Sequence, residues 1–444
     1  MKLRFAPSPT GFLHVGNARI AVTNALLALK HGGEFVLRLD DTDTERSRPE
    51  YATAIEEDLG WLGIAFTGPV RQQDRTALYD SAAAKLKASG HLYPCFESEE
   101  ELRFKREQRA KQGKPPVYDR AALKMTQEQL ERALANGKAP YWRFKLSQGS
   151  REWNDGVLGA RSVKLPPISD PVLIRADGSF LYTFTSVVDD IDMGITHIVR
   201  GEDHVTNTGV QLDIFAALGA NTGALHFAHL PLLTDADGGP LSKRLGSLGL
   251  RQMRRDGVEP AALVGYLAAL GTSHDPKPGL PADLAPGFEI SAVSKSSARF
   301  DPRQMLALNR KLLHEMAFDV AQPRLPAGAT EHFWGVVRGN LDMMSEARGW
   351  WDVAAGHIAP AELPGEEEFL RAALETLPPE PFTPMTWPDW TNAVKAATGR
   401  KGKALFMPLR LALTGEDHGP DLKDLLPLIG RARAAERLRA AIQA

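Results

Sequence analysis

The order strand, turn, helix, strand at the start of the chain is the feature that most constrains its fold. "KLRF" (2–5) is apolar enough for a buried strand, and the two prolines of the following "APSPTG" keep the backbone extended. From Val15, apolar residues recur at spacings of three and four up to a Gly-Gly pair, which indicates a helix packed on a sheet. "EFVLRLDDTD" (34–43) is the next strand. This order predicts a parallel sheet, whose ligands bind outside the carboxyl ends of its strands.

Composition places the chain among ordinary water-soluble proteins. Hydrophobic residues make up 43% and charged residues 24% of its 444 residues, which are usual values for globular domains. No apolar run approaches the ~20 residues of a membrane span, and a proline-rich turn stands where a signal peptide would have its apolar core. We therefore expect a cytoplasmic protein that does not enter membranes.

Cysteine content and net charge exclude some classes of site. The single cysteine, Cys95, excludes an internal disulfide and a zinc site built from several cysteines. The formal net charge is −2, so binding to nucleic acid would need local basic patches. The candidates are "RFKREQRAKQGK" (103–114) and "GRARAAERLRAA" (430–441). Each is by itself typical of a solvent-exposed helix face.

The length exceeds what one compact core needs, so we expect roughly two to four domains. Beyond Tyr93, charged helical segments and the alternating stretches "YWRFKL" and "REWNDGVLG" indicate an α+β insertion. Beyond Phe300 nearly every pattern is helical. The expected parts are the first half of a sheet domain (1–92), the insertion (93–186), the second half of the sheet domain (187–225), a linking region (226–315) and a helical region (316–444).

Two stretches of the chain suit phosphate chemistry. "APSPTGFLHVGN" (6–17) places His14 and Gly16 where a strand gives way to a helix, whose free N–H groups attract phosphate. An imidazole there can hydrogen-bond phosphate oxygens, and glycine lets a flat base approach the backbone. "PLSKRLGS" (240–247) offers the ammonium of Lys243 to a polyphosphate. Neither the dinucleotide fingerprint nor a Walker-type loop is present, so the nucleotide site would be of another kind.

Five separated motifs, taken in order, carry a resemblance to a known family. They are "RFAPSPTGFLHVGNAR" (4–19), "LRLDDTDTERS" (37–47), "VVDDIDMGITHIVRGEDH" (187–204), "LSKR" (241–244) and "KGKALFMPLRLALTGEDHGP" (401–420). The first and fourth are similar to the HIGH and KMSKS elements of class I aminoacyl-tRNA synthetases. The set as a whole resembles the bacterial type of glutamyl-tRNA synthetase, from residue 4 to the last helices.

The resemblance implies an α/β fold, in which a Rossmann-like class I catalytic domain is split by an insertion that binds the acceptor end of tRNA. The linking region would carry the "LSKR" loop, and the mainly α-helical C-terminal region would bind the anticodon. Such enzymes join L-glutamate to AMP, using ATP that carries Mg²⁺, and then transfer it to the 3′ end of tRNA, releasing AMP and pyrophosphate. We expect a monomer whose partners are L-glutamate and the glutamate tRNA.

The matched motifs also imply roles for single residues. His14 and Lys243 would be catalytic donors to the phosphates, with Arg244 as a helper at the leaving pyrophosphate. Arg4 and Arg200 would pair with the side-chain carboxylate of glutamate, for which the guanidinium fork is suited. The residues expected to bind ATP are Pro7, Thr10, His14, Gly16, Asn17, Asp203, Lys243 and Arg244. The residues expected to bind glutamate are Arg4, Ala6, Ser8, Asp40, Tyr182 and Arg200.

Two positions depart from the pattern of relatives. Many have Glu where this chain has Asp40, the carboxylate expected to bind the amino group of glutamate, so the geometry of that contact is open. Some hold zinc through three cysteines in the insertion, which Cys95 alone does not permit; we expect no zinc and no metal held by side chains. We interpret the acidic cluster of Asp189, Asp190 and Asp192 as helix caps and internal hydrogen-bond partners.

Other functions stay open at this point. An adenylyltransferase that needs no RNA, or a shortened paralogue that glutamylates a modified base, would not need the helical residues after Phe300. Glutaminyl relatives carry Glu-Pro-Asn-Gly where this chain has "SPTG" (8–11), and they end in β-barrels. A non-enzymatic RNA-binding protein would not need His14, Lys243 and both arginines together. The last alternative is an enzyme that also or mainly charges the glutamine tRNA.

Overall fold

The computed structural model describes residues 1–235, 237–239, 241 and 248–444 of the chain. Residue contacts divide the chain into two compact units. The first unit combines Met1–Gln252 with Val264–Asp301, and the second combines Met253–Leu263 with Pro302–Ala444. All the described residues of the predicted site belong to the first unit.

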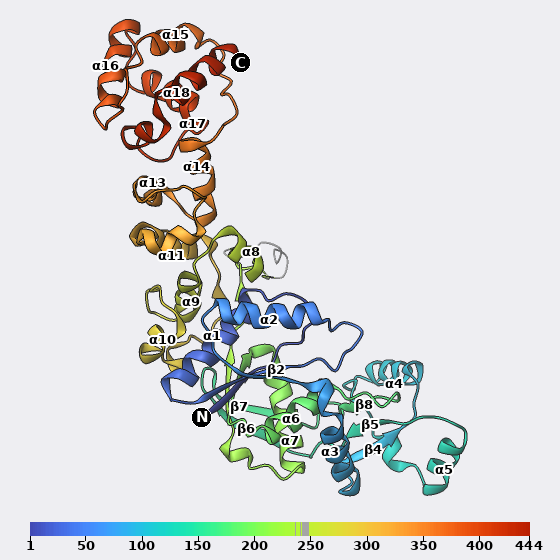
Figure 1. Ribbon diagram of the computed structural model, residues 1–444. Coiled ribbons are helices and arrows are strands. Elements are labelled where there is room, and N and C mark those ends of the chain that lie inside the picture. The colour runs from blue at the N-terminus through green and yellow to red at the C-terminus, as the bar shows by residue number, and fades with distance from the viewer. Residues whose placement is uncertain (236, 240, 242–247) are drawn as a thin grey trace. The chain divides into compact units, whose positions relative to one another are not determined.

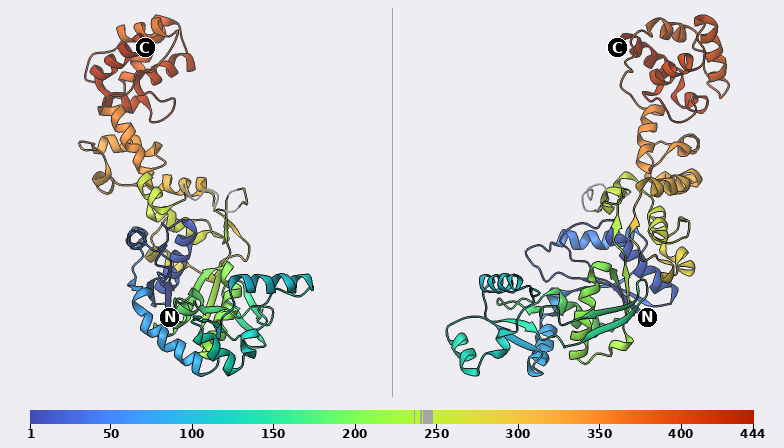
Figure 2. Two further views of the ribbon diagram at one scale, coloured as in Figure 1. Left: turned by 90° about the vertical axis from the view of Figure 1, so that its right-hand side faces the viewer. Right: turned by 180° about the vertical axis from the view of Figure 1, so that it is seen from behind.

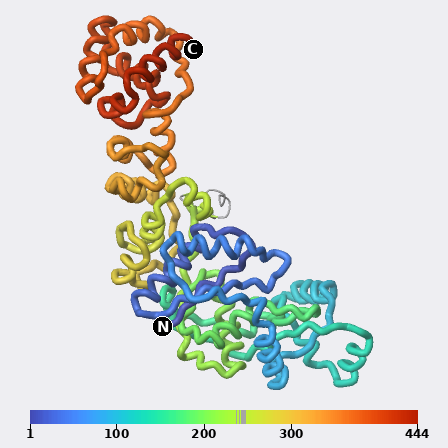
Figure 3. Tube along the Cα trace, in the orientation of Figure 1, coloured from blue at the N-terminus to red at the C-terminus, as the bar shows by residue number. Residues whose placement is uncertain are grey.

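A mostly parallel sheet forms the centre of the first unit (Figure 1). Among the described residues it has seven strands, in the order β3 (Thr67–Arg71), β2 (Glu34–Leu39), β1 (Lys2–Phe5), β9 (His197–Gly201), β10 (His226–Leu230), β6 (Ser150–Asp155) and β7 (Gly159–Lys164). Neighbouring strands are parallel except β6 and β7, which form an antiparallel hairpin. β1 therefore lies between β2 and a strand from much later in the chain, as the blue and green segments of Figure 3 show. The predicted parallel sheet is confirmed.

Helix α1 (Val15–Lys30) packs on this sheet through the apolar face that the sequence predicts. The other helices of this part of the chain are α2 (Pro49–Trp61), α3 (Thr76–Ala88), α6 (Tyr182–Asp192) and α7 (Val205–Ala217). Helix α1 contacts β1, β2 and β9. Of the predicted apolar spacing, Ala18, Ala21, Val22, Ala25 and Leu26 are buried, whereas Leu29, near the end of the helix, is exposed. Helices α6 and α7 pack on each other and share an apolar core with α3.

The insertion has an antiparallel sheet of its own, with strands β4 (Leu92–Cys95), β5 (Tyr141–Phe144) and β8 (Val172–Ile174). Helices α4 (Glu99–Lys111) and α5 (Gln127–Ala135) accompany it (Figure 1). The hairpin β6–β7, which we expected inside the insertion, instead joins the large sheet by pairing with β10. Alternation of apolar and polar residues identifies a hairpin but not the sheet edge that receives it, because that edge is distant in sequence.

The remaining elements of this part of the chain are short. Strand β11 (Leu233–Thr234) lies parallel to β12 (Ala298–Arg299). The helices between them are α8 (Leu250–Asp256), α9 (Pro260–Ala269) and α10 (Pro281–Leu284). Strand β10, which we expected in the linking region, is a member of the large sheet. Its place beside β9 puts the start of the linking region next to the predicted site.

The second unit is helical, as predicted. Its helices are α11 (Pro302–Glu315), α12 (Phe318–Ala321), α13 (Glu331–Val337), α14 (Ala347–Ala355), α15 (Glu367–Glu375), α16 (Thr386–Thr398), α17 (Lys403–Thr414) and α18 (Leu422–Gln443). Helices α15 to α18 gather around a core that includes the fully buried Trp390, Leu409 and Leu426 (Figure 2). In neither unit does a described helix combine the length and apolar character needed to cross a membrane.

Candidate active site

A pocket of about 350 Å³ opens at the carboxyl ends of β1, β9 and β10, which is the edge that the strand order predicts. The predicted residues that line it are Arg4, Ala6, Pro7, Ser8, His14, Gly16, Asn17, Tyr182, Arg200 and Asp203. Thr10 and Asp40 are not in its described wall. Lys243 and Arg244 lie outside the described residues.

His14 is the N-cap of α1 and keeps one ring nitrogen for a ligand. Its Nδ1 accepts a hydrogen bond from the backbone N–H of Gly16 at 3.0 Å, and its own backbone N–H donates to Oδ1 of Asn17 at 3.3 Å. Burial lowers the pKa of His14, which favours the neutral ring, and with Nδ1 as an acceptor the hydrogen sits on Nε2. The cap therefore offers an N–H donor beside the free N–H groups of the first helical turn, which suits an anion.

Gly16 is required by the position of the His14 ring. A Cβ atom at residue 16 would stand 2.8 Å from Cε1 and 3.0 Å from Nδ1 of His14. A side chain here would therefore displace the ring from its capping position. From the sequence we expected this glycine to make room for a base, and the structure adds a nearer reason, which is the space that the ring itself occupies.

The chain that follows the "LSKR" stretch returns directly to His14. Two backbone hydrogen bonds, of 3.2 and 3.0 Å, join residues 13–15 to residues 248–250, and His14 stands opposite Gly249 in this antiparallel bridge. Lys243 itself lies outside the described residues. The residues directly after the second of the two stretches assigned to phosphate (240–247) are thus hydrogen-bonded to the helix start at the end of the first stretch (6–17).

Arg200 is a buried cation at the end of β9, with no directly paired carboxylate among the described residues. It is 6% exposed. Its Nη2 donates to Oγ1 of Thr208 at 2.6 Å and to Oε1 of Gln211 at 2.7 Å, and Nη1 donates to the hydroxyl of Tyr182 at 3.3 Å. Its Nε is buried and has no partner in the described part of the chain. Because an unneutralised buried charge is costly, this arrangement suits an anionic ligand.

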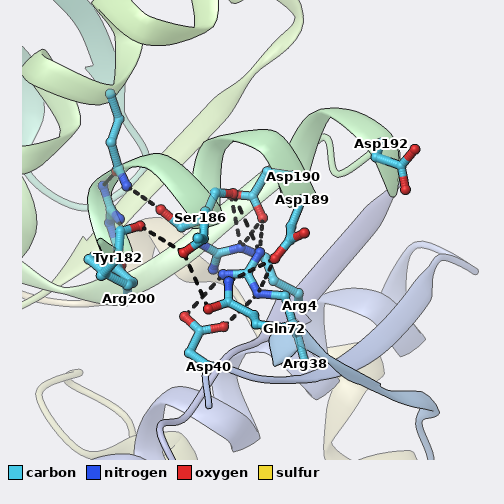
Figure 4. A network of polar contacts seen from close by, with 12 residues as sticks. Arg4, Arg38, Asp40, Gln72, Tyr182, Ser186, Asp189, Asp190, Asp192 and Arg200 are labelled. Carbon is cyan, nitrogen blue, oxygen red and sulfur yellow. Dashed lines mark hydrogen bonds and ion pairs between the residues drawn. The ribbon is translucent and has the colours of Figure 1, made fainter. Parts of the chain in front are cut away.

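Arg4 is held from one side and leaves the other side to the pocket (Figure 4). Its Nε donates to Asp190 at 3.1 Å, and no described residue accepts a hydrogen bond from its two terminal nitrogens. Asp190 also pairs with Arg38 at 2.8 Å, so one negative charge is shared by two guanidinium groups. Arg4 therefore retains positive charge that a ligand carboxylate can neutralise.

Asp40 lies in the buried network of Figure 4, outside the described pocket wall. Its Oδ1 accepts from Nε of Arg38 at 2.7 Å and its Oδ2 accepts from Nη2 of Arg38 at 3.2 Å. Burial raises the pKa of Asp40 to about 6, and the charge of Arg38 partly opposes that rise. A contact between Asp40 and the amino group of a ligand would thus have to be shared with Arg38, and it stays a prediction.

The acidic residues of α6 serve as internal hydrogen-bond partners, as we expected, but they do not cap this helix, whose N-cap is Leu181. Asp189 accepts from Nε2 of Gln72 and Nε of Arg75, both at 2.7 Å, and from the hydroxyl of Tyr79 at 3.0 Å. Asp192 accepts from Nη2 of Arg75 at 2.5 Å. These bonds tie α6 to α3 and the turn before it. Throughout the described ranges, no group of three or more His, Cys, Asp or Glu side chains is placed to hold a metal ion.

The other predicted residues stand on loops at the strand ends. The carbonyl of Ser8 accepts from the backbone N–H of Thr10 at 2.8 Å, which closes a tight turn after β1. The Asp203 side chain is 60% exposed and belongs to the pocket wall. A Cβ atom on Gly201 would stand 2.5 Å from Oδ1 of Asp203. Glycine at 201 therefore leaves space for this carboxylate.

Sequence reasoning missed a line of buried polar residues behind Arg200. Nδ1 of His229 lies 2.5 Å from Asp155, and its Nε2 lies 2.9 Å from the hydroxyl of Thr208. It also missed Arg19, which lines the pocket and donates to a backbone carbonyl at 2.7 Å. The available signal was a single histidine within the apolar stretch "FAHLPLL".

Known proteins are similar to this chain over nearly its whole length. Residues 1–305 match the family described as "tRNA synthetases class I (E and Q), catalytic domain", and residues 356–442 match "Anticodon binding domain". "Glutamate--tRNA ligase 2" of Granulibacter bethesdensis is 64% identical over 437 residues, which cover 98% of this chain and 97% of that protein. "Glutamate--tRNA ligase 2" of Gluconobacter oxydans is 59% identical over 444 residues, which cover 100% of both chains.

A solved structure extends the agreement to the fold. It is the crystal structure of a glutamate tRNA ligase from Elizabethkingia meningosepticum in complex with its amino acid. Its TM-score to this chain is 0.83 at 26% sequence identity, covering 100% of this chain and 99% of that chain. Since the sequence relatives span nearly all of the chain, and the sheet-edge pocket gathers the residues of the family's motifs, the chain belongs to the class I tRNA synthetases for glutamate and glutamine, among the glutamate–tRNA ligases.

Proposed function

We propose that this chain is a glutamate–tRNA ligase, which activates L-glutamate with ATP to glutamyl-adenylate and transfers the glutamate to the 3′ end of its tRNA. The observation that carries the proposal is the presence of Arg4 and Arg200 in one pocket with the N-cap of α1. The two guanidinium groups suit an amino acid with an anionic side chain, and the capped helix start suits a polyphosphate.

The glutamate subsite would be built around Arg200. Its Nε, which has no partner among the described residues, and the terminal nitrogens of Arg4 would supply donors for the side-chain carboxylate. Tyr182 and Ser8 would add neutral hydrogen bonds, and the backbone at Ala6 would complete the wall. Asp40 would take the amino group in spite of its bonds to Arg38.

The ATP subsite would be built around the start of α1. During activation the glutamate carboxylate attacks the α-phosphorus while pyrophosphate leaves, so negative charge grows at the phosphates. His14, through Nε2, and the free N–H groups of α1 would hold those phosphates, and Lys243 with Arg244 would neutralise the departing pyrophosphate. Mg²⁺ carried on ATP would add positive charge. Pro7, Thr10, Gly16, Asn17 and Asp203 would complete the subsite.

The RNA partner would be the glutamate tRNA. The insertion would hold its acceptor end, and the helical region would read its anticodon, an assignment supported by the match of residues 356–442 to an anticodon-binding domain. We infer that the enzyme works in the cytoplasm as a monomer, binds no zinc, and takes Mg²⁺ only with ATP. The basic stretch 103–114 would offer its charge to phosphate groups of RNA, since most of it lies in α4, where no residue is buried.

Charging of purified tRNAs with labelled glutamate tests the proposal. The expected result is ATP-dependent attachment of glutamate to the glutamate tRNA, with release of AMP and pyrophosphate. Charging of the glutamine tRNA by the same preparation would widen the set of RNA partners, and exclusive charging of it would overturn the choice of tRNA. Absence of charging on both would overturn the proposed reaction.

A further inference from the structure

A continuous line of buried hydrogen bonds runs from β6 to Arg200. Oδ2 of Asp155 lies 2.5 Å from Nδ1 of His229 on β10, and Nε2 of the same ring lies 2.9 Å from Oγ1 of Thr208 on α7. That oxygen lies 2.6 Å from Nη2 of Arg200 on β9. All of these side chains are buried, and only Arg200 lines the pocket. The line therefore reaches the ligand site from inside the protein.

Asp155 sets the direction of the hydrogen bonds along this line. Its Oδ1 accepts from the backbone N–H groups of Val157 and Leu158 at 3.1 and 3.0 Å, and its Oδ2 accepts from Nε1 of Trp153 at 3.1 Å. Burial alone would raise the pKa of Asp155, but its bonds with His229 and with the backbone outweigh burial and lower the pKa. A charged Asp155 takes the hydrogen of Nδ1, so Nε2 of a neutral His229 is left as an acceptor.

Neutrality of the His229 ring follows from its surroundings. Burial lowers its pKa against the opposing effect of Asp155, and the charges of Arg200 and Arg4 lower it further. The hydroxyl of Thr208 has one hydrogen and two acceptors within reach, Nε2 of the neutral ring at 2.9 Å and the backbone carbonyl of His204 at 3.1 Å. Because Nε2 carries no hydrogen, its short contact is a hydrogen bond only when the hydroxyl donates to the ring, and the hydroxyl oxygen then accepts from Arg200. In the described part of the chain, the side chains hydrogen-bonded to the guanidinium of Arg200 are those of Tyr182, Thr208 and Gln211, all uncharged.

We propose that His229, held by Asp155, is a positioning residue that acts through Thr208 to aim Arg200 at the side-chain carboxylate of glutamate. The inference rests on the proposed role of Arg200 in binding glutamate. A carboxylate in the place of Thr208 would orient the guanidinium equally well, but it would also neutralise it. Orientation by neutral groups keeps the whole charge of Arg200 for the substrate.

The second neutral contact of Arg200 follows the same design. Gln211 accepts from Nη2 at 2.7 Å and donates through its own Nε2 to Oγ of Ser186 at 2.7 Å. Gln211 and Thr208 together leave Nη2 engaged in the core, while Nε stays without a described partner. Loss of the Thr208 hydroxyl would leave one of these two supports and free the guanidinium to turn about the other.

Replacement of the hydroxyl tests the proposal. Thr208→Val keeps the shape of the side chain and removes its oxygen. In aminoacylation at saturating ATP and tRNA, the KM for glutamate should rise about 10- to 100-fold, as for loss of a hydrogen bond to a charged group, while kcat and the KM for ATP stay within about threefold. Thr208→Ser restores the oxygen and should return the KM for glutamate to within about threefold of the starting value.

The matched control is another buried threonine. Thr391 of α16 donates its hydroxyl to the carbonyl of Trp387 at 2.8 Å. Thr391→Val therefore also removes a buried hydroxyl, at a position far in the sequence from the hydrogen-bonded residues that lead to Arg200. It should leave the KM for glutamate unchanged. An equal rise in that KM in both variants would overturn the proposal, because the effect would then be one of stability alone.

Two further variants distinguish the positioning role of His229 and Thr208 from the proposed role of Arg200 in binding glutamate. Arg200→Lys should raise the KM for glutamate more than Thr208→Val does; if it leaves that KM unchanged, the role of Arg200 is wrong and the inference falls with it. If Arg200→Lys raises the KM for glutamate but Thr208→Val does not, the positioning of Arg200 through Thr208 is overturned, while its role in binding glutamate stands. As a single variant, His229→Gln should raise the KM for glutamate. In the double variant with Thr208→Val it should raise that KM no further, whereas additive effects would contradict action through Thr208.

Discussion

Buried arginines of the first unit show how charge pairing separates a structural residue from a ligand-binding one. Arg38 pairs with Asp40 at 2.7 Å and with Asp190 at 2.8 Å; burial alone would lower its pKa, but these carboxylates raise it. Arg4 shares Asp190 with it, and the described hydrogen-bond partners of Arg200 are all neutral. Positive charge left uncompensated therefore increases towards the pocket, where the substrate is proposed to supply the missing carboxylate.

Discrimination between glutamate and glutamine follows from this gradient. Glutamine is nearly isosteric with glutamate but would leave the charges of Arg4 and Arg200 unpaired. We expect it to be rejected by roughly 2–5 kcal/mol, as for breaking a buried charge pair. The ratio of kcat/KM for the two amino acids measures this, and a preference below about tenfold would contradict the pocket assignment.

Loss of a phosphate donor should slow activation without weakening RNA binding. His14→Ala and Lys243→Ala should each lower the rate of adenylate formation by on the order of 10²-fold, as for loss of one preorganised donor. His274→Ala, at an exposed position, is a control expected to keep the full rate. Rapid-quench measurement of adenylate, together with tRNA binding, tests this. Near-normal rates in both donor variants would sink the assignment of catalytic residues.

Acid should destabilise the protein partly through His197, whose ring stacks on that of His226 with a centroid distance of 4.5 Å. Burial and the neighbouring His226 lower the pKa of His197 to about 4. The unfolded chain, with an ordinary pKa, binds the proton first, so stability is complete above about pH 6.5 and is lost as the pH falls towards 4. Between pH 7 and 5, the free energy of unfolding of the original chain should therefore fall by about 1–2 kcal/mol more than that of His197→Gln. This range allows for the partial exposure of the ring.

Urea unfolding at the two pH values measures this difference. The test depends on which of the two proteins loses more stability on acidification. If His197→Gln loses more stability on acidification than the original chain, the ring is charged in the folded protein and the reading of its surroundings is wrong.

Among the elements, α18 shows that a basic stretch need not be an RNA-binding face throughout. Arg437 is buried and donates to the carbonyls of Leu413 at 2.7 Å and Gly356 at 3.2 Å. Arg439, two residues later, is exposed. The sequence presents both as members of one basic patch, because charge carries no information on which side of the helix meets the core.

Substitution of the two arginines should therefore have unequal effects. Arg437→Met leaves buried carbonyls without donors and should lower the free energy of unfolding of the second unit by about 2–4 kcal/mol. Arg439→Met should change it by less than about 0.5 kcal/mol. Thermal unfolding followed by calorimetry distinguishes them, and equal stabilities would contradict the structural role of Arg437.

For the whole molecule, the proposed function places RNA binding on two parts of the chain and chemistry on a third. The described residues 248–250, which follow the "LSKR" stretch, pair with residues 13–15 at the start of α1, where the phosphates are proposed to bind. Binding of tRNA can shift this loop only by as much as its affinity for the two arrangements differs. If the insertion and the helical region bind tRNA as proposed, their contacts with the RNA would supply such a difference.

Activation should accordingly depend on RNA. We expect negligible ATP–pyrophosphate exchange with glutamate alone and robust exchange once the glutamate tRNA is added. A tRNA of unrelated specificity serves as the control and should not restore exchange. Rapid exchange without RNA would refute the coupling and would favour the adenylyltransferase alternative.

Local patterns determined much of this molecule. The strand, turn and helix around His14, the parallel sheet and the helical second unit were all predictable, because the spacing of apolar residues reports which face of an element is buried. The motifs also predicted half of the described pocket wall, including Arg4, His14, Tyr182, Arg200 and Asp203.

Contacts between distant residues were decided only by the tertiary structure. The hairpin β6–β7 joins the large sheet through a pairing of Asp155 with Phe227, Asp40 is engaged by Arg38, and His229 reaches Asp155 across 74 positions of the chain. Hydrogen bonds and charge pairs of this kind depend on which side chains meet after the elements have packed. Residue spacing along the sequence does not report which distant side chains meet, and so the sequence identified Arg4 and Arg200 of the pocket but neither Arg19 nor the buried groups behind Arg200.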